Sequence, residues 1–326
     1  MTGTGGQRRV MVLGGTGFLG GHLRTAFPVP KAPKWSVSPE TSPGPSARTG
    51  APDECFIALD LLTATPRELR ALFADTAPDV VVNAAGAVWK VTPQQMHRAN
   101  TELTTTVTAA LCETSPGPRL IQLGSVHEYG AGTRDSGLTE GSTEAPVTPY
   151  GRSKLAASRS VLDAAAAGAL DGVVLRMANI VGPGVPAGSL LGDIAARLER
   201  YAEDPGATDA ELLFPPLRAE RDFVDVRDVV DAVLAAARAP RAEVSGRVIN
   251  IGSGRAVRTG EVVERLLALS GLPVRLVERA ADGAAPGAAA DCQKLDVSRA
   301  RRLLGWEPRR DLDASLSGLL SSLSLA

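Results

Sequence analysis

The sequence has few of the residues that build metal sites and disulfide frameworks. Its 326 residues include three cysteines and three histidines. Cys55, Cys112 and Cys292 form an odd, scattered set, and the histidines are equally dispersed, so neither set has metal-ligand spacing. We therefore expect no metal site, and the sparse cysteines fit a reducing, cytoplasmic location.

The chain also lacks a strong charge of either sign and any long apolar run. The formal net charge of −1 provides no basic field for nucleic acid and no polybasic patch for a membrane. No apolar run approaches the ~18–20 residues that cross a bilayer. Residues 1–9 contain no apolar stretch typical of a secretion signal. The composition, 44% hydrophobic and 22% charged, is that of an ordinary globular protein.

Glycine is abundant, with 34 residues, and its first cluster follows the first apolar run. Residues 10–13 predict a buried strand that breaks into Gly14-Gly15-Thr16-Gly17-Phe18-Leu19-Gly20 and continues as a helix. This context predicts a dinucleotide site. Gly14 permits a sharp turn, Gly17 a close approach to a pyrophosphate at the positive helix end, and Gly20 close packing of the helix. The alternative is a tight turn without a ligand.

Apolar runs and helical stretches then alternate, which predicts an α/β fold with a parallel sheet covered on both faces. We expect strands at 35–38, 56–60, 79–86, 120–125 and 173–176, and helices at 65–74, 92–112 and 148–167. The rhythm stops near residues 182–184. Beyond it we expect helices at 189–202, 227–237 and 259–269, strands at 212–214 and 248–251, and a loop at 281–290. The predicted domains are 1–181 with 222–250, and a smaller lobe of 182–221 with 251–326.

A tyrosine and a lysine one helical turn apart give the sharpest local signal. Tyr150 and Lys154 project from the same helix face. Ser125 directly follows a predicted sheet strand, as Gly17 and Gly86 follow theirs. In open parallel sheets the ligand crevice lies beyond these carboxyl ends, so the groups converge on one site. The alternative is an exposed tyrosine stacked on a lysine stem.

In combination, these motifs resemble the extended branch of the short-chain dehydrogenase/reductase (SDR) family. The resemblance rests on Gly14-xx-Gly17-xx-Gly20, Asn83-Ala84-Ala85-Gly86, Asn100, residues 125–130, Tyr150-xxx-Lys154, and residues 175–184, 221–229, 250–254 and 304–308. It implies a doubly wound, Rossmann-type sheet with a smaller C-terminal mixed α/β substrate lobe. It also implies nucleotide-sugar substrates and a homodimer built through helices 92–112 and 148–167.

The resemblance assigns catalytic roles to four residues. Tyr150 corresponds to the acid/base, and Ser125 would donate to the carbonyl oxygen of the substrate. Lys154 would hold the nicotinamide ribose, and Asn100 would orient Lys154. An unperturbed tyrosine titrates near 10, so action at neutral pH requires a pKa lowered by roughly 3 units. The Lys154 ammonium and the charge of an oxidised nicotinamide would supply that shift.

The resemblance also implies a set of cofactor contacts. They are Gly14, Thr16, Gly17, Phe18, Leu19, Gly20, Ser36, Ser38, Asp60, Leu61, Ala84, Ala85, Gly86, Tyr150, Lys154 and Asn179. NAD-specific sites usually place an acid on the second strand for the ribose 2′-hydroxyl. Here no acid occurs before Glu40, whereas Ser36 or Ser38, with Lys34 or Arg48, could hold a 2′-phosphate. We expect NADP, with NAD as the alternative.

A third set of residues is expected to contact the substrate. It comprises Val126, His127, Asn179, Ser189, Leu190 and Arg221. Asn179 and Arg221 match family positions that hold the diphosphate, although Arg221 could instead pair with Asp222 or Glu220. His127 either contacts the sugar or points away under the following loop, and Glu128 is either solvated or anchors that loop.

Departures from the family pattern reduce the number of reaction types that we expect for this chain. The family's 4,6-dehydratases carry an Asp-Glu pair where this chain has Val126 and His127, so dehydration is not expected. We predict an NADPH-dependent ketoreductase acting on a dTDP-4-keto-6-deoxyhexose. The alternatives are an epimerase that retains NAD and, more remotely, a non-enzymatic dinucleotide-sensing regulator. The intact Tyr150–Lys154 pair argues against the regulator.

Overall fold

The chain folds into two compact units. The computed structural model describes residues 8–27, 34–38, 54–115, 117–132, 136–206, 210–279 and 291–325. Unit 1 comprises Met1–Glu128, Pro146–Arg176 and Val230–Ile249, and unit 2 comprises Tyr129–Ala145, Met177–Val229 and Asn250–Ala326. Compared with the expected boundaries, residues 129–145, 177–181 and 222–229 and Asn250 group with unit 2. The expected loop 281–290 lies outside the described residues.

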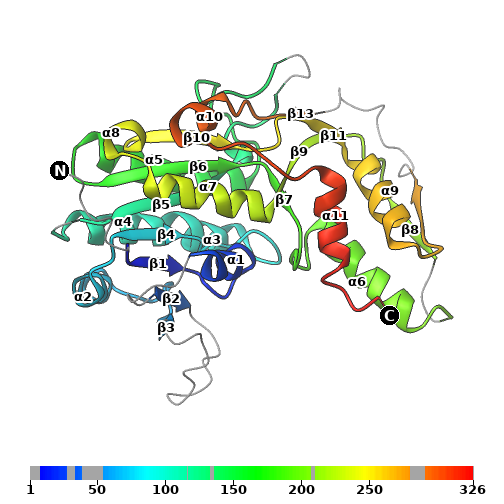
Figure 1. Ribbon diagram of the computed structural model, residues 1–326, viewed down its shortest axis with the longest axis horizontal. Helices are drawn as coiled ribbons and strands as arrows, with labels where there is room; N and C mark the ends of the chain where they lie inside the picture. Colours follow the sequence, from blue (N-terminus) through cyan, green and yellow to red (C-terminus); the bar gives the residue numbers. More distant parts are fainter. Residues whose placement is uncertain are drawn as a thin grey trace. The chain divides into compact units, whose positions relative to one another are not determined.

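A seven-stranded sheet forms the centre of unit 1, in the order β10-β6-β5-β4-β1-β2-β3 (Figure 1). The strands are β1 (Val10–Leu13), β2 (Lys34–Ser38), β3 (Glu54–Ala58), β4 (Val80–Asn83), β5 (Arg119–Ser125), β6 (Asp171–Met177) and β10 (Arg247–Ile251). Neighbouring strands from β3 to β5 are parallel. Every residue of β1, β4 and β5 is buried, as in strands covered on both faces.

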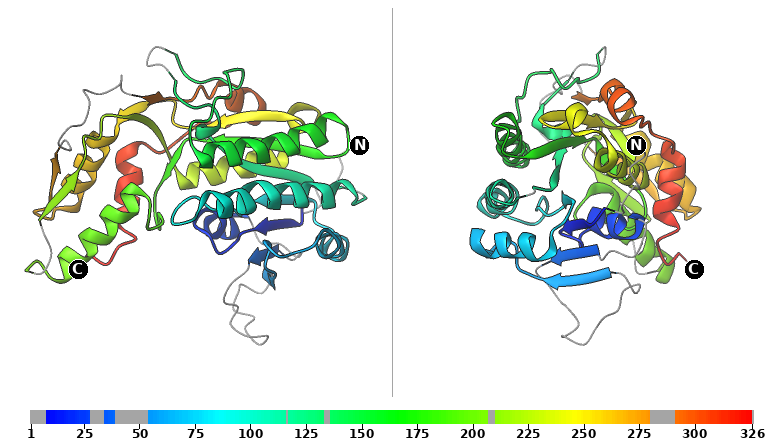
Figure 2. Two further views of the ribbon diagram at one scale, coloured as in Figure 1. Left: turned by 180° about the vertical axis from the view of Figure 1, so that it is seen from behind. Right: turned by 60° about the vertical axis from the view of Figure 1, so that its left-hand side comes forward.

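Helices cover both faces of this sheet, which confirms the predicted doubly wound fold (Figure 2). One face carries α2 (Pro66–Thr76), α4 (Leu103–Cys112) and α5 (Pro149–Ala166). The other carries α1 (Phe18–Ala26) and α7 (Val226–Arg238), and a short α8 (Arg241–Val244) precedes β10. An apolar cluster of buried residues joins β1, β4 and β5 to α2, α4 and α5.

Helix starts in unit 1 follow the local sequence. Thr65 and Glu68 form a reciprocal capping box at the start of α2. Thr148 accepts a hydrogen bond from the Gly151 N–H at 3.0 Å, which caps α5 as its sequence predicts. The helix expected at 92–112 has three parts: α3 (Pro93–His97), a π-helical turn η1 (Arg98–Glu102) and α4. The periodicity did not predict that wider turn.

Unit 2 contains two small sheets packed with helices. One sheet joins β7 (Asn179–Val181), β9 (Glu220–Asp225), β11 (Ala256–Arg258) and β13 (Cys292–Gln293), and the other pairs β8 (Glu211–Phe214) with β12 (Arg275–Glu278). The helices are α6 (Leu190–Glu203), α9 (Thr259–Ser270), α10 (Ser298–Leu304) and α11 (Leu312–Leu320). The predicted helices at 189–202 and 259–269 and the strand at 212–214 are confirmed, whereas β7, β9, β11, β12 and β13 were not predicted.

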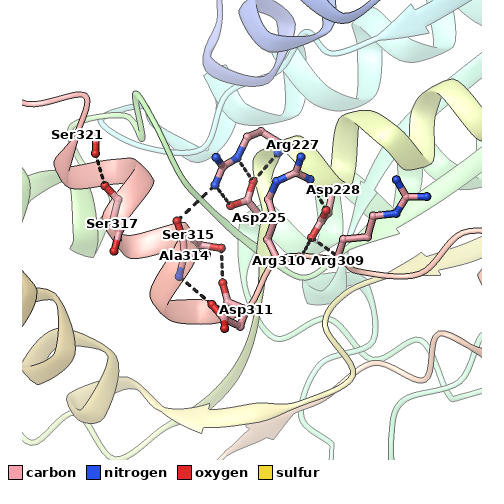
Figure 3. A network of polar contacts seen from close by, with 10 residues as sticks. All are labelled: Asp225, Arg227, Asp228, Arg309, Arg310, Asp311, Ala314, Ser315, Ser317 and Ser321. Atoms are coloured by element: carbon pink, nitrogen blue, oxygen red, sulfur yellow. Dashed lines mark hydrogen bonds and ion pairs between the residues drawn. The ribbon is translucent and has the colours of Figure 1, made fainter.

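The segment after α10 is fixed to the start of α7 (Figure 3). The buried Asp228 carboxylate accepts the backbone N–H groups of Arg309 and Arg310 at 3.1 and 3.0 Å and pairs with the Arg310 guanidinium at 2.5 Å. The Trp306 indole donates to the Asp228 carbonyl oxygen at 2.9 Å. Two motifs distant in sequence, residues 221–229 and 304–308, therefore contact each other through Asp228 and Trp306.

Candidate active site

The glycine-rich turn brings α1 into direct contact with the end of β1. Gly14 has a φ of 77°, a conformation that L side chains rarely adopt, and its carbonyl accepts the Gly17 N–H at 3.0 Å. A Cβ on Gly20 would overlap the Gly14 carbonyl oxygen, and a Cβ on Gly14 would lie 2.7 Å from the Ala85 Cα. Gly14 and Gly20 are therefore required by the fold itself, and the turn lies against the residues that follow β4.

Gly17 has a different environment. A Cβ there would meet only the Gly14 carbonyl oxygen, at 3.4 Å, which is ordinary van der Waals contact. Internal packing therefore does not explain a glycine at this position, whereas close approach of a pyrophosphate does. No side chain caps the start of α1, and its first turn carries no acidic residue. This helix start fits the phosphates of a dinucleotide.

The turn after β4 is held by two buried asparagines. The Asn83 amide donates to Gln122 at 2.8 Å and accepts the Ala85 N–H at 3.2 Å. Asn100, in the π-helical turn, exchanges hydrogen bonds with the backbone of Ala87 at 2.8 and 2.9 Å. A Cβ on Gly86 would lie 2.6 Å from the Asn100 Oδ1. The small residues expected beside the cofactor thus lie on a fixed backbone.

Asn100 also reaches α5. Its Nδ2 donates to the Ser153 Oγ at 3.0 Å, one residue before Lys154. Lys154 is buried, at 7% exposure, and its Nζ donates to the Leu123 carbonyl oxygen on β5. Burial lowers the pKa of Lys154, and the nearby Glu128 carboxylate opposes this effect. The structure thus ties Asn100 to the helix that carries Lys154.

The predicted acid/base group lies against the predicted hydroxyl. Ser125 ends β5 and is 6% exposed, and its hydroxyl hydrogen-bonds the half-buried Tyr150. Burial raises the pKa of Tyr150 to about 12; the Ser125 hydrogen bond lowers it in part, and the Glu128 carboxylate raises it further. Without a cofactor, burial therefore outweighs the Ser125 hydrogen bond and the pKa of this phenol is raised. The lowering that we expect also requires the positive charge of a bound oxidised nicotinamide, and it stays a prediction.

His127 lies beside Tyr150. The two rings meet edge to face with centroids 5.8 Å apart, so His127 does not point away under the following loop. A Cβ on Gly151 would overlap the His127 carbonyl oxygen. That glycine lets the first turn of α5 approach η2 (Val126–Glu128) closely enough to bring the rings together. Val126 is 1% exposed and belongs to the core.

Glu128 is neither exposed nor solvated. Both Glu128 and Arg176 are fully buried, and their Oε2 and Nε atoms are 2.6 Å apart. The solvated interpretation of Glu128 is therefore wrong, and the anchoring one is right. The signal in the sequence was Arg176 itself, because a charge at the end of the apolar run Val173–Leu175 requires a buried partner.

Ser36 and Ser38, expected at the 2′-phosphate, lie in the middle and at the end of β2, and Asp60, expected at the adenine, follows β3. The register pairs Ser36 with Val12, but the side chains of Ser36 and Ser38, and the whole of Arg48, lie outside the described residues. The exposed Asp60 carboxylate accepts the Leu62 N–H at 2.9 Å. Leu61 is 4% exposed and packs in the core.

In unit 2, the expected substrate residues have internal partners. Asn179 donates to the Asp222 carbonyl oxygen at 2.9 Å. Arg221 pairs with Asp291 at 2.6 Å, so its carboxylate partner is neither Asp222 nor Glu220. Ser189 caps α6 by accepting the Gly192 N–H at 3.1 Å, and the adjacent Leu190 packs against the core of unit 2.

A family comparison decides the class of protein. Residues 10–252 match the model of the NAD dependent epimerase/dehydratase family. The chain belongs to this family. It is an NAD(P)-dependent oxidoreductase of the extended SDR type, as the motifs predict.

The sequence matches to individual relatives cover nearly the whole chain. The chain is 42% identical to a dTDP-6-deoxy-L-talose 4-dehydrogenase (NAD(P)(+)) of Kitasatospora kifunensis, over 98% of this chain and 96% of that one. It is 27% identical to a UDP-glucose 4-epimerase of Azospirillum brasilense, over 98% and 92%. A solved structure of RMD from Pseudomonas aeruginosa complexed with NADPH has the same fold, with a TM-score of 0.77 at 23% identity, over 97% and 98%.

Proposed function

We propose that this family member is an NADPH-dependent ketoreductase that acts on a dTDP-4-keto-6-deoxyhexose. The observation that carries the proposal is the contact of the Ser125 hydroxyl with the Tyr150 phenol, one helical turn before the buried Lys154. A phenol held there can donate the proton that carbonyl reduction needs. The 42% identity to a dTDP-sugar 4-dehydrogenase supports the substrate class.

Each site residue has a role in this reduction. The bound cofactor supplies hydride to the carbonyl carbon. Tyr150 donates its hydroxyl proton to the carbonyl oxygen, which yields the alcohol. Ser125 donates a hydrogen bond to the same oxygen as negative charge develops there. The Lys154 ammonium stabilises the tyrosinate that remains and holds the nicotinamide ribose.

The remaining predicted residues bind the cofactor or the substrate under this proposal. Under this proposal the glycine turn, Thr16 to Leu19 and Ala84 to Gly86 hold the dinucleotide, with Asp60 and Leu61 at the adenine. Ser36 and Ser38 hold the 2′-phosphate, which favours NADP because β2 carries no acid. His127 contacts the sugar beside Tyr150, and Asn179 and Arg221 hold the diphosphate.

An epimerase that retains NAD is the second candidate, supported by the 27% identity to a UDP-glucose 4-epimerase. Both candidates use the same tyrosine. They differ in the cofactor, because a reductase exchanges NADPH in every turnover and an epimerase keeps its NAD.

One experiment separates the two candidates. The purified enzyme is denatured to identify any released nucleotide, and a fresh sample is mixed with a dTDP-4-keto-6-deoxyhexose and NADPH or NADH. The proposal predicts stoichiometric NADPH oxidation. Tightly held NAD, no NADPH consumption, and epimerisation of a dTDP-hexose supplied in a parallel sample would favour the epimerase.

A further inference from the structure

A buried ion pair lies directly behind the Ser125–Tyr150 contact. Glu128 ends η2 and Arg176 lies near the end of β6, and both side chains are 0% exposed. Solvent and substrate do not reach such groups. Any effect of the pair on the reaction therefore passes through the groups that it contacts.

Glu128 holds the backbone of the hydroxyl-bearing residue. Its Oε1 accepts the Ser125 N–H at 2.8 Å, while Oε2 accepts the Arg176 Nε–H at 2.6 Å. A Cβ on Gly124 would lie 2.6 Å from Oε1, so the strand has a glycine where the carboxylate approaches. A continuous chain of contacts runs from Arg176 through Glu128 and Ser125 to the hydroxyl of Tyr150.

We propose that Glu128, anchored by Arg176, is a positioning residue that fixes Ser125 and thereby the hydroxyl group on Tyr150. The assignment rests on the proposed function, which makes Tyr150 a proton donor. The charge of Glu128 acts in the same direction as its geometry, because the carboxylate raises the pKa of both Tyr150 and Lys154. It thus favours the protonated form of each.

The same two strands supply a matched control. Arg119 and Asp171 are the first residues of β5 and β6, and they form an ion pair at 3.0 Å with side chains 5% and 12% exposed. This pair joins the strands at the end opposite Ser125. Neutralising Asp171 leaves a buried arginine uncompensated, as neutralising Glu128 does, without affecting the catalytic groups.

The test compares Glu128→Gln, Glu128→Asp and Asp171→Asn in the full-length enzyme. For both Glu128 variants we expect kcat to fall about 10–100-fold, as for outer-shell partners of catalytic groups, with KM values within about threefold. Asp171→Asn should retain kcat within about twofold, although its loss of thermal stability matches that of Glu128→Gln. Wild-type kcat in Glu128→Gln, or an equal loss in Asp171→Asn, would overturn the assignment.

A pH readout separates position from charge. Three titratable groups near Tyr150 are His127, whose ring meets the phenol ring, Glu128, which acts on its pKa, and Lys154, one helical turn along α5; Arg176 pairs with Glu128. Removing the carboxylate lowers the pKa of Tyr150, so the alkaline loss of reduction should move to lower pH in Glu128→Gln. It should stay in place in Glu128→Asp, which keeps the charge but shortens the side chain.

The pKa can also be measured without a sugar substrate. NMR of ζ-¹³C-tyrosine in the NADP⁺ complex, with the Tyr150 resonance assigned from Tyr150→Phe, should show a lower pKa in Glu128→Gln. An unchanged pKa would contradict the role of the charge, whereas a lowered pKa in an enzyme that reduces no dTDP-sugar would reject only the proposed substrate. If Glu128→Gln does not fold, the double variant Glu128→Gln/Arg176→Met, which leaves no buried charge uncompensated, replaces it in both measurements.

Discussion

Tyr150 is the residue on which the proposed reduction depends most. Replacing it with phenylalanine removes the donated proton but keeps the ring beside His127. We expect kcat to fall about 10²–10⁴-fold, the usual contribution of a positioned general acid. Affinity for NADPH, measured by nucleotide fluorescence, should change little. Retention of kcat in this variant would remove Tyr150 from the mechanism.

Asp222 gives a second prediction for a single residue. Burial raises the pKa of this fully buried carboxyl to about 6, although Ser253, Gly254 and Leu295 all donate hydrogen bonds to it. An unfolded aspartate titrates near 3.9. Between about pH 4 and pH 6 the folded state binds more protons, so the free energy of unfolding falls as the pH rises through this window.

The variant Asp222→Asn isolates this effect. The stability of wild type relative to the variant should decrease by about 2 kcal/mol from pH 4 to pH 7, because most of the two-unit pKa difference is traversed in this window. Urea unfolding at both pH values measures the change. A difference that does not vary with pH would show that the four hydrogen bonds to the carboxylate compensate its burial.

At the scale of elements, substitutions at two adjacent glycines in α1 should affect nucleotide binding and helix stability separately. A Cβ on Gly20 would overlap the Gly14 carbonyl oxygen, whereas a Cβ on Gly21 has no atom within 4 Å. Gly20→Ala should displace α1 and weaken NADPH binding by at least about tenfold. Gly21→Ala should bind normally and gain up to about 1 kcal/mol in unfolding free energy.

Titration calorimetry with NADPH and thermal unfolding test this pair of variants. Equal nucleotide affinities in Gly20→Ala and Gly21→Ala would mean that the contact between α1 and the glycine turn does not shape the nucleotide site. The comparison controls for helix propensity, because both substitutions replace glycine by alanine in the same turn.

The regular elements of unit 1 follow closely from the sequence. Apolar runs such as Val80–Asn83 become buried strands, and Thr65 and Thr148 begin helices through side-chain caps. The irregular features could not be predicted from the sequence. The π-helical turn around Asn100 depends on contacts with Ala87 and Ser153, which local periodicity does not encode.

The candidate site was predictable in its residue types but less so in its electrostatics. Ser125, Tyr150 and His127 lie together, as motif order and sheet topology indicate. The raised pKa of Tyr150 and the partner of Glu128 depend on burial, which only the folded structure shows. The ion pair of Arg221 with Asp291 likewise joins residues 70 positions apart.

At the scale of the whole molecule, we propose a cytoplasmic homodimer. The helices expected to form its four-helix contact are the run from α3 to α4 and helix α5. Light scattering should give twice the mass of the chain. Charged substitutions at the exposed Thr105 and the half-buried Thr106 of α4 should shift the enzyme to a monomer, because unpaired charges in an interface are costly. A monomeric mass for the wild type would reject the dimer.

The most direct test of the reductase assignment follows the hydride. The enzyme is incubated with NADPH deuterated at C4 of the nicotinamide, on either face, and with a dTDP-4-keto-6-deoxyhexose. We predict that one of the two labelled forms transfers deuterium to the former carbonyl carbon of the sugar, with one NADP⁺ formed per alcohol. No conversion with either labelled form, or epimerisation of a dTDP-hexose in a parallel incubation without deuterium incorporation, would contradict the assignment.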